Sequence, residues 1–375
     1  QALAQAIRVE QQAAWPARCC GGRSVCRSMF RWLWNFAKRH RKKLLFTAAC
    51  AGGAYYVWKI WLPRLQQQLL QKLLKESLEL ARNEEEKKAS FTHKQQVSDS
   101  YVRKALVELQ QRHQALFSVE ERFESVKGAA SKEAKLERFQ ELQSECLARL
   151  ASALCVLNAL LLLHRVEFNI VGRELAGADP DGAEVHAQFL ETTCLFKEEG
   201  IEQVANAARR AVNKCTEASK FTPTLSVTTE QLEKFFLDVC GEVQGELLAD
   251  SRCVSLFLPE AVDSKIPEEH RPKAKPLLDE ARDYLESPQF AEVLKAVSAA
   301  AVQRLVATFS NGTANSPEGF LAAGKACPLA KLNGQFIELH KSILDEDGDF
   351  IARFSEEPVV DQFCQGLYFQ EGGWR

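Results

Sequence analysis

The sequence lacks the motifs around which most enzyme active sites are built. It holds no GxxxxGKS/T or GxGxxG phosphate-binding loop, no HExxH zinc motif, no GxSxG nucleophile turn and no paired CxxC. Its seven histidines are scattered, and no two share a predicted helix face at ligand spacing. The acidic run from Asp345 to Asp349 lacks the alternate spacing and terminal glutamate of a calcium loop, which favours a solvated turn. We therefore expect no enzyme, no metal site and no cofactor.

Acidic residues are missing from a long stretch near the N-terminus, between Gln11 and Lys75. Residues 1–75 carry a formal charge of +13, so the other 300 residues carry −15 to reach the net charge of −2. A basic head suits an anionic membrane surface, whereas an acidic body disfavours nucleic acid. We expect membrane lipids, and no nucleic acid, among the partners.

Cysteine pairs of the kind that form disulfide frameworks or zinc sites are also missing. Eight of the twelve cysteines lie in the body: Cys146, Cys155, Cys194, Cys215, Cys240, Cys253, Cys327 and Cys364. Most of them fall inside helical patterns. This distribution indicates reduced, buried thiols in a cytosolic domain rather than a disulfide framework.

Methionine occurs once, at Met29. Residues 1–28 are rich in Arg, Cys and Gly without core periodicity, so we expect an upstream extension outside the fold; a mitochondrial presequence is the alternative. Residues 29–43 form a basic, aromatic targeting head. Its basic cluster consists of Lys38, Arg39, Arg41, Lys42 and Lys43.

Long apolar runs are scarce, and the first lies directly after the head. With Lys59 reaching to the interface, residues 44–62 approach the roughly 20 residues that span a bilayer. Tyr55, Tyr56, Trp58 and Trp61 resemble an aromatic belt at one end. A cleaved signal or an ordinary buried helix are alternatives, but no small-residue cleavage site follows. We expect a retained transmembrane anchor, followed by a cytosolic helical domain over residues 63–375, although the positive-inside rule alone would place the basic head in the cytosol.

The body shows helical periodicity throughout and no sustained period-two alternation, which predicts an all-α fold. The apolar stretch 147–164 is interrupted by Arg149, Ser152 and Asn158, which favours a buried core helix over a second membrane span. The predicted helices cover residues 65–88, Ser98 or Ser100 to about 116, about 132 onward, 185–215, 228 or 229 to 250, 275–286, 288–310, 329–344 and 359–368.

Several motifs, in one order along the chain, resemble the peroxin-3 family. They are WNFAKRHRKK at 34–43 with the apolar run behind it, KLE-x-aromatic at 135–139, RVEFNIVG at 165–172, RDYLESPQF at 282–290, and PLAK with NGQ at 328–335. The resemblance covers about residues 29–368.

The resemblance implies an elongated cytosolic helical bundle, held at the peroxisomal membrane by a single N-terminal span. The protein would arrive at this membrane directly or through the endoplasmic reticulum. It also implies a groove, at the end of the body distant from the membrane, that receives an amphipathic helix from the N-terminal part of peroxin-19. Peroxin-19 brings peroxisomal membrane proteins as cargo, so docking would serve their insertion. Family members keep a short tail inside the organelle, which resolves the conflict over topology.

Residues of the implied groove follow from the same motifs. A tryptophan follows KLE-x in the family pattern, and Phe139 stands there in this chain. The implied partner-binding residues are Phe139, Leu136, Leu142, Val126 and Lys331. For Phe139 and the two leucines, the alternative is a position in the core. For the protein, the alternative function is a membrane-anchored tether or adaptor for organelle inheritance, contact sites or pexophagy.

Overall fold

The structure is a computed structural model. It describes residues 38–43, 46, 53, 55, 59, 62–175, 182–191, 196–248, 252–258, 266–311, 326–345 and 349–369. The extension 1–28 and nearly all of the expected anchor 44–62 lie outside these residues. Within the targeting head, the five residues of the basic cluster are helical and exposed. The chain divides into two compact units between Glu84 and Glu85, and the body is the second.

Helix α4 runs from Leu62 to Ala115 without interruption. The prediction of two helices, separated between Lys88 and Ser98, is therefore wrong. The intervening residues contain neither glycine nor proline, so nothing in the backbone breaks the helix. From Phe91 onward, one side of α4 is buried at spacings of three and four residues, through Val102, Leu106 and Leu109.

Among the described residues, the other elements are also helical, apart from one short strand pair. Strands β1 (Ser226–Val227) and β2 (Cys327–Pro328) pair antiparallel, with Ser226 opposite Pro328 and Val227 opposite Cys327. The helices are α5 (Val119–Lys127), α6 (Lys132–Leu175), α7 (Gly182–Glu191), the π-helix η2 (Phe196–Gly200), α8 (Ile201–Ser219), α9 (Thr229–Leu247), α10 (Arg252–Phe257), α11 (Arg271–Leu285), α12 (Pro288–Asn311), the 3-10 helix η4 (Leu329–Leu332), α13 (Asn333–Ile343), α14 (Asp349–Glu356) and α15 (Pro358–Tyr368). The all-α prediction is confirmed.

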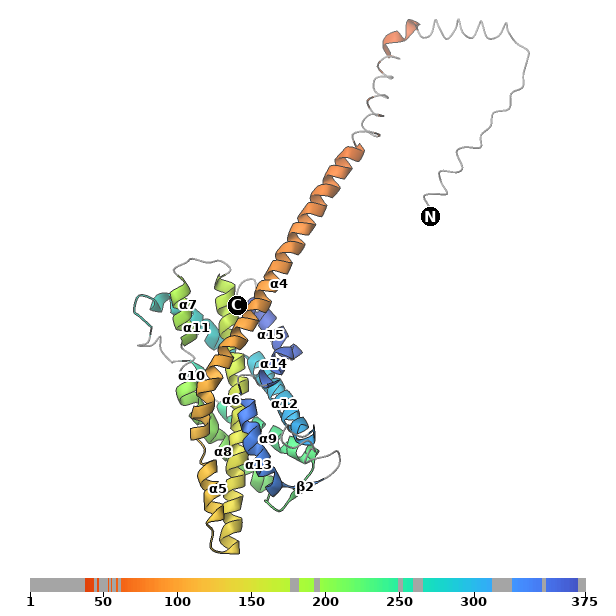
Figure 1. Ribbon diagram of the computed structural model, residues 1–375. Helices are drawn as coiled ribbons and strands as arrows, with labels where there is room; N and C mark the ends of the chain where they lie inside the picture. Colours follow the sequence, from red (N-terminus) through yellow and green to blue (C-terminus); the bar gives the residue numbers. More distant parts are fainter. Residues whose placement is uncertain are drawn as a thin grey trace, which may run out of the picture. The chain divides into compact units, whose positions relative to one another are not determined.

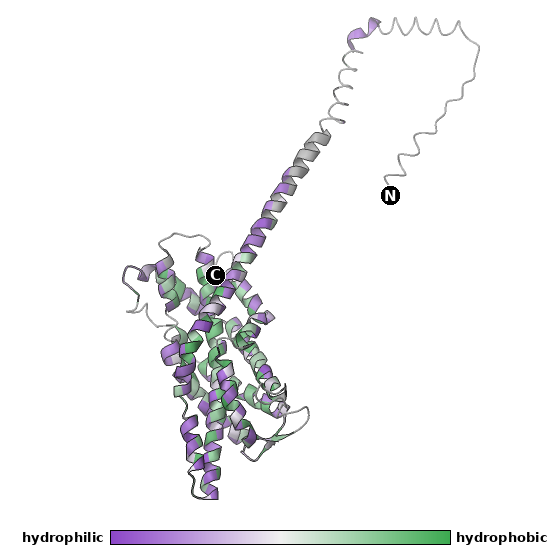
Figure 2. Ribbon diagram, viewed as in Figure 1, coloured by the Kyte–Doolittle hydropathy of each residue, from purple (hydrophilic) through white to green (hydrophobic). Residues whose placement is uncertain are grey.

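Helix α6 forms the centre of the body and packs against α5, α8, α9, α12, α13 and α15 (Figure 1). Every residue from Leu147 to His164 is buried, including the three polar residues that interrupt the apolar run. Among the described residues, α6 is the one helix apolar and long enough to cross a membrane, and its most apolar window lies wholly inside the body. The prediction of a core helix is confirmed. Hydrophobic residues accordingly follow α6 and its neighbours (Figure 2).

Cysteines of the body occupy this interior as free thiols. Those whose side chains the structure describes are unpaired and buried: Cys146, Cys155, Cys215, Cys240, Cys327 and Cys364. Burial raises the pKa of the Cys146 and Cys364 thiols to about 12, so both are protonated and unreactive at neutral pH. This agrees with the expectation of reduced thiols.

Helix starts were predicted well where a capping residue marks them. Thr228 caps α9 in a capping box with Gln231, and Ser287 accepts a hydrogen bond from the Phe290 amide just before Pro288 begins α12. The short helices α5, α10 and α14 were missed, because no helix was predicted for the stretches that form them. The helix predicted over 185–215 is instead α7, η2 and α8. Gly200 is the last residue of η2. Glycine fits there because it has no Cβ, and a Cβ at this position would lie 2.5 Å from the Phe196 ring.

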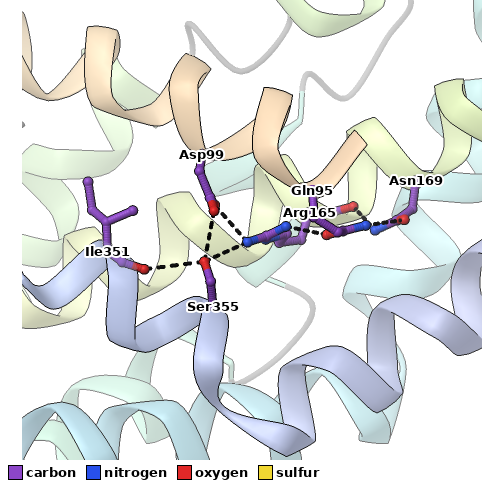
Figure 3. Close-up of polar contacts among 6 residues, drawn as sticks. All are labelled: Gln95, Asp99, Arg165, Asn169, Ile351 and Ser355. Atoms are coloured by element: carbon purple, nitrogen blue, oxygen red, sulfur yellow. Dashed lines mark hydrogen bonds and ion pairs between the residues drawn. The ribbon is translucent and has the colours of Figure 1, made fainter. Parts of the chain in front are cut away.

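A buried polar network joins α4 to α6 and α14 (Figure 3). Arg165, which is 2% exposed, donates to Asp99 Oδ1 at 2.6 Å and to Ser355 Oγ at 2.7 Å, and it also binds Gln95. Gln95 in turn donates to Asn169 Oδ1 at 2.8 Å. A buried network of this kind holds α4 in one register on the core, whereas a guanidinium without counter-charge there would be costly.

We predict that Arg165→Met destabilises the protein by about 3 kcal/mol, because it leaves the half-buried Asp99 carboxylate without its counter-charge. Burial already raises the pKa of Asp99 against the opposing charge of Arg165, so loss of that charge in the variant will raise the pKa further. Denaturant unfolding measures the loss. Arg210→Met, which removes an exposed ion pair with Glu246, is the control and should change stability by less than about 0.5 kcal/mol. Equal effects of the two substitutions would contradict the prediction.

Candidate docking surface

Helices α5 and α6 form an antiparallel hairpin, seen at the lower end of the body in Figure 1. Ser131 begins α6, where its Oγ accepts a hydrogen bond from the Ala134 amide at 3.1 Å. The first turns of α6 extend beyond the enclosed core, since residues 131–141 are exposed or half-buried. Both helices are mostly hydrophilic there (Figure 2). Apolar side chains that stay exposed on this hairpin are therefore not required by the core.

Four polar contacts connect the two helices of the hairpin. They are Arg122 Nη1 to Glu141 Oε2 at 2.8 Å, Arg138 Nη1 to the Ser125 carbonyl at 2.7 Å, Arg149 Nη1 to Glu120 Oε1 at 3.0 Å, and the Ser118 amide to Glu145 Oε1 at 3.4 Å. The α6 partners recur at three- and four-residue spacing, so they form one stripe that faces α5. Leu142 lies in the middle of this stripe and is 1% exposed.

Helix α5 contributes little apolar surface to this contact. Of its nine residues, Val119 and Val126 are buried. Burial of a valine contributes at most about 1.5–3 kcal/mol, and an exposed ion pair about 0–1 kcal/mol. Ordering each residue costs about 1–2 kcal/mol, and a helix this short is not stable in isolation. Apart from the pairing of Glu120 with the buried Arg149, helix α5 is therefore held in place by few stabilising contacts.

One side of the hairpin carries an apolar patch, which we define as Phe123, Leu136 and Phe139. Phe123 is 46% and Leu136 53% exposed, while Phe139 is half-buried against the core. Helical periodicity puts Phe123 and Phe139 on the same side of the hairpin, opposite the Arg122–Glu141 ion pair. The Lys127 ammonium lies 4.5 Å from the centre of the Phe123 ring. The patch therefore presents aromatic and aliphatic surface bordered by a cation.

The opposite side of the hairpin is a polar groove of about 730 Å³ between α5, α6 and α8. Arg209 of α8 binds Glu145 at 3.1 Å and stacks over the Phe117 ring at 4.5 Å. The lining residues are Ser118, Arg122, Glu137, Gln140, Glu141, Ser144, Glu145, Ala148, Arg209 and Asn213. With charges of both signs paired across it, this side suits water rather than an apolar partner.

A buried histidine pair supports the base of the hairpin. His113 Nδ1 lies 2.9 Å from His340 Nε2, and His113 Nε2 lies 2.9 Å from Ser152 Oγ. Burial, followed by the nearby charges of Arg149 and Arg209, lowers the pKa of His113 to about 3. Burial and the neighbouring His113 lower the pKa of His340 to about 2. Both rings are therefore neutral at pH 7, which lets one nitrogen donate and the other accept.

The five expected partner-binding residues fall into three environments. Leu136 and Phe139 belong to the apolar patch. Val126, 7% exposed, and Leu142, 1% exposed, are enclosed between α5 and α6. Lys331 is exposed in η4, the turn that follows β2 and leads into α13. As partner contacts, all five remain predictions.

Phe123 was missed because no helix was predicted between about residues 116 and 132. The signal was present: Val119, Phe123 and Val126 recur at four- and three-residue spacing, and Gly128 follows at the helix end. The described residues contain no group of three or more His, Cys, Asp or Glu side chains that could hold a metal ion.

Known proteins resemble the chain along nearly its whole length. Bovine and human peroxisomal biogenesis factor 3 are each 24% identical to it, over 377 and 376 residues, and the alignments cover 91% of this chain and 97% of each relative. The chain is similar to peroxisomal biogenesis factor 3. The rat protein of that name also aligns at 24% identity, with the same coverage. No family model matches the chain.

We predict that the protein loses stability as the pH falls below about 6.5. Between that value, usual for an exposed histidine, and the lowered pKa values of His113 and His340, the unfolded chain binds protons that the folded protein does not. The free energy of unfolding should fall by up to about 1.4 kcal/mol per pH unit for each such histidine.

Denaturant unfolding between pH 7.5 and pH 5 measures this slope. His340→Gln, whose amide can still hydrogen-bond to His113, should lower stability at pH 7 yet flatten the pH dependence. His93→Gln, at an exposed position of α4, is the control and should leave the slope unchanged. An unaltered slope in His340→Gln would show that the pair does not bind protons on unfolding.

Proposed function

We propose that this chain is a membrane-anchored docking receptor of the peroxin-3 family, and that it receives the amphipathic N-terminal helix of peroxin-19 at the peroxisomal membrane. In this role it takes part in peroxisome biogenesis by enabling the insertion of peroxisomal membrane proteins. The similarity to peroxisomal biogenesis factor 3 from several mammals, nearly end to end in both chains, supports the family and the biogenesis role. Residues 44–62 would anchor the chain, with the body in the cytosol.

The apolar patch is the observation that carries the docking proposal. An amphipathic helix presents apolar residues at three- and four-residue spacing to a hydrophobic surface on its partner. Phe123, Leu136 and Phe139 offer such a surface on a hairpin that is otherwise polar. Exposed aromatic side chains of this kind commonly supply most of the energy of an interface. No covalent step is needed, because the receptor acts by binding alone.

Phe139 would serve as one aromatic anchor in the position where the family pattern has tryptophan. A phenylalanine keeps the ring but lacks the indole N–H, which lowers affinity by about 1–2 kcal/mol if that group is hydrogen-bonded. Phe123 of α5 supplies a second exposed ring on the same side of the hairpin. We infer that the two phenylalanines share the role of the single tryptophan.

Binding of an N-terminal peroxin-19 peptide to the full chain, purified in a mild detergent, tests the proposal. Phe139→Ala and Phe123→Ala should each weaken binding about 10-fold or more, because each removes an aromatic contact from the centre of the patch. Val107→Ala removes a side chain of similar exposure from α4 and should change affinity less than about twofold. Isothermal titration calorimetry measures all four proteins.

Absence of binding by the wild-type chain, with its helical circular dichroism intact, would refute docking. A tether or adaptor role in organelle inheritance, contact sites or pexophagy would then be the better hypothesis. Equal weakening by Val107→Ala and Phe139→Ala would place the binding surface elsewhere on the body.

A further inference from the structure

Two residues expected in the partner-binding surface are inaccessible in the closed hairpin. Helical periodicity turns Val126 of α5 toward α6 and Leu142 of α6 toward α5, and both side chains are buried. Leu142 lies at the centre of the stripe that bonds to α5. A partner helix resting on the apolar patch would stop at the edge of these side chains. It can reach them only if α5 moves away from α6.

The way in which α5 is attached permits such a movement. Its buried side chains are two valines, and its N-cap residue Ser118 makes no side-chain capping bond. Gly128, Ala129, Ala130 and Ser131 form the connection to α6, a loop of small side chains. Segments with few buried apolar contacts are those that open locally while the rest of a protein stays folded.

The ion pairs that hold α5 closed are open to solvent. The Arg122 and Glu141 side chains are 35% and 55% exposed, and the Glu120 side chain is 58% exposed. Dissolved salt screens such contacts. Arg149 is different, because its guanidinium is buried and Glu120 is its ion-pair partner. Opening removes that partner, so the closed hairpin predominates in the free protein.

We propose that α5 is a flap that lifts as a unit from α6 and uncovers an apolar strip, formed by Val119 and Val126 on α5 and by Leu142 on α6. The strip continues the apolar patch, because Leu142 follows Phe139 by three residues on α6. The amphipathic helix that docks on the patch extends onto this strip. The identity of that helix rests on the function proposed above, whereas the flap does not.

Thiol labelling of the full chain in detergent tests the flap without any partner. Val119→Cys and Val126→Cys, made separately, place a thiol of similar size on the buried face of α5. Each variant is treated with N-ethylmaleimide, and the modification is followed at individual peptides by mass spectrometry. Each rate is divided by that of the same site in the urea-unfolded chain. Cys155, buried in α6, is the internal reference for global unfolding.

Both engineered thiols should react at least about 10-fold faster than Cys155 by this measure. Addition of Arg122→Gln should raise their rates several-fold further, and so should 0.5 M salt, because each weakens the ion pair with Glu141. Lys214→Gln removes an exposed pair with Glu242 between α8 and α9 and should leave the rates unchanged. If either thiol reacts as slowly as Cys155, α5 does not lift as a unit and the proposal is wrong.

The same experiment separates the flap from the docking proposal. Fast labelling with no binding of the peroxin-19 peptide would support the flap and refute docking. Peptide binding with labelling as slow as that of Cys155 would refute the flap and support docking on the closed patch.

Discussion

The enclosure of α6 from Cys146 to Val171 is the constraint on which the body depends. From Cys146 to Val171 every side chain of this helix is buried, so each neighbouring helix must offer it an apolar face or a matched polar group. Several polar residues of α6 have such partners. Arg165 is paired with Asp99 and Ser355 on two other helices, and Ser152 bonds to the His113 ring. These contacts set the register of α4, α13 and α14 around the centre.

The first turns of α6 are exposed, so the same constraint does not apply to them. Where the helix extends beyond its neighbours, before Leu142, most of its side chains are exposed and have no need of buried partners. Leu136 nevertheless remains apolar and 53% exposed, and Phe123 faces the same region from α5. Apolar side chains kept on a solvated hairpin are expected where another molecule covers them. Weak attachment of α5 suits the same purpose, because a partner can then enlarge the surface it meets.

The sequence predicted the parts of the fold that have a strong local signal. The apolar run 147–164 marked the core helix, and Thr228, Ser287 and Pro288 marked two helix starts through their capping chemistry. It did not predict that α4 is continuous, because a polar stretch without glycine or proline permits either a linker or a helix. Pairing between Ser226–Val227 and Cys327–Pro328 depends on tertiary contacts that two-residue strands do not encode locally.

Two of the three patch residues, Leu136 and Phe139, followed from motif resemblance. In the structure Leu136 and Phe139 are partly exposed, whereas Val126 and Leu142 are buried. This difference depends on how α5 packs against α6, which no sequence motif encodes. Phe123 was recognised as part of the patch only from the structure, which shows that α5 is a helix.

Site-specific photocrosslinking tests the central claim, docking at the hairpin, most directly. A benzoylphenylalanine introduced at Leu136 should form a covalent link to the N-terminal peroxin-19 peptide on irradiation, while the same residue at Val107 should not. Equal capture at the two positions, or capture at Val107 alone, would contradict the account.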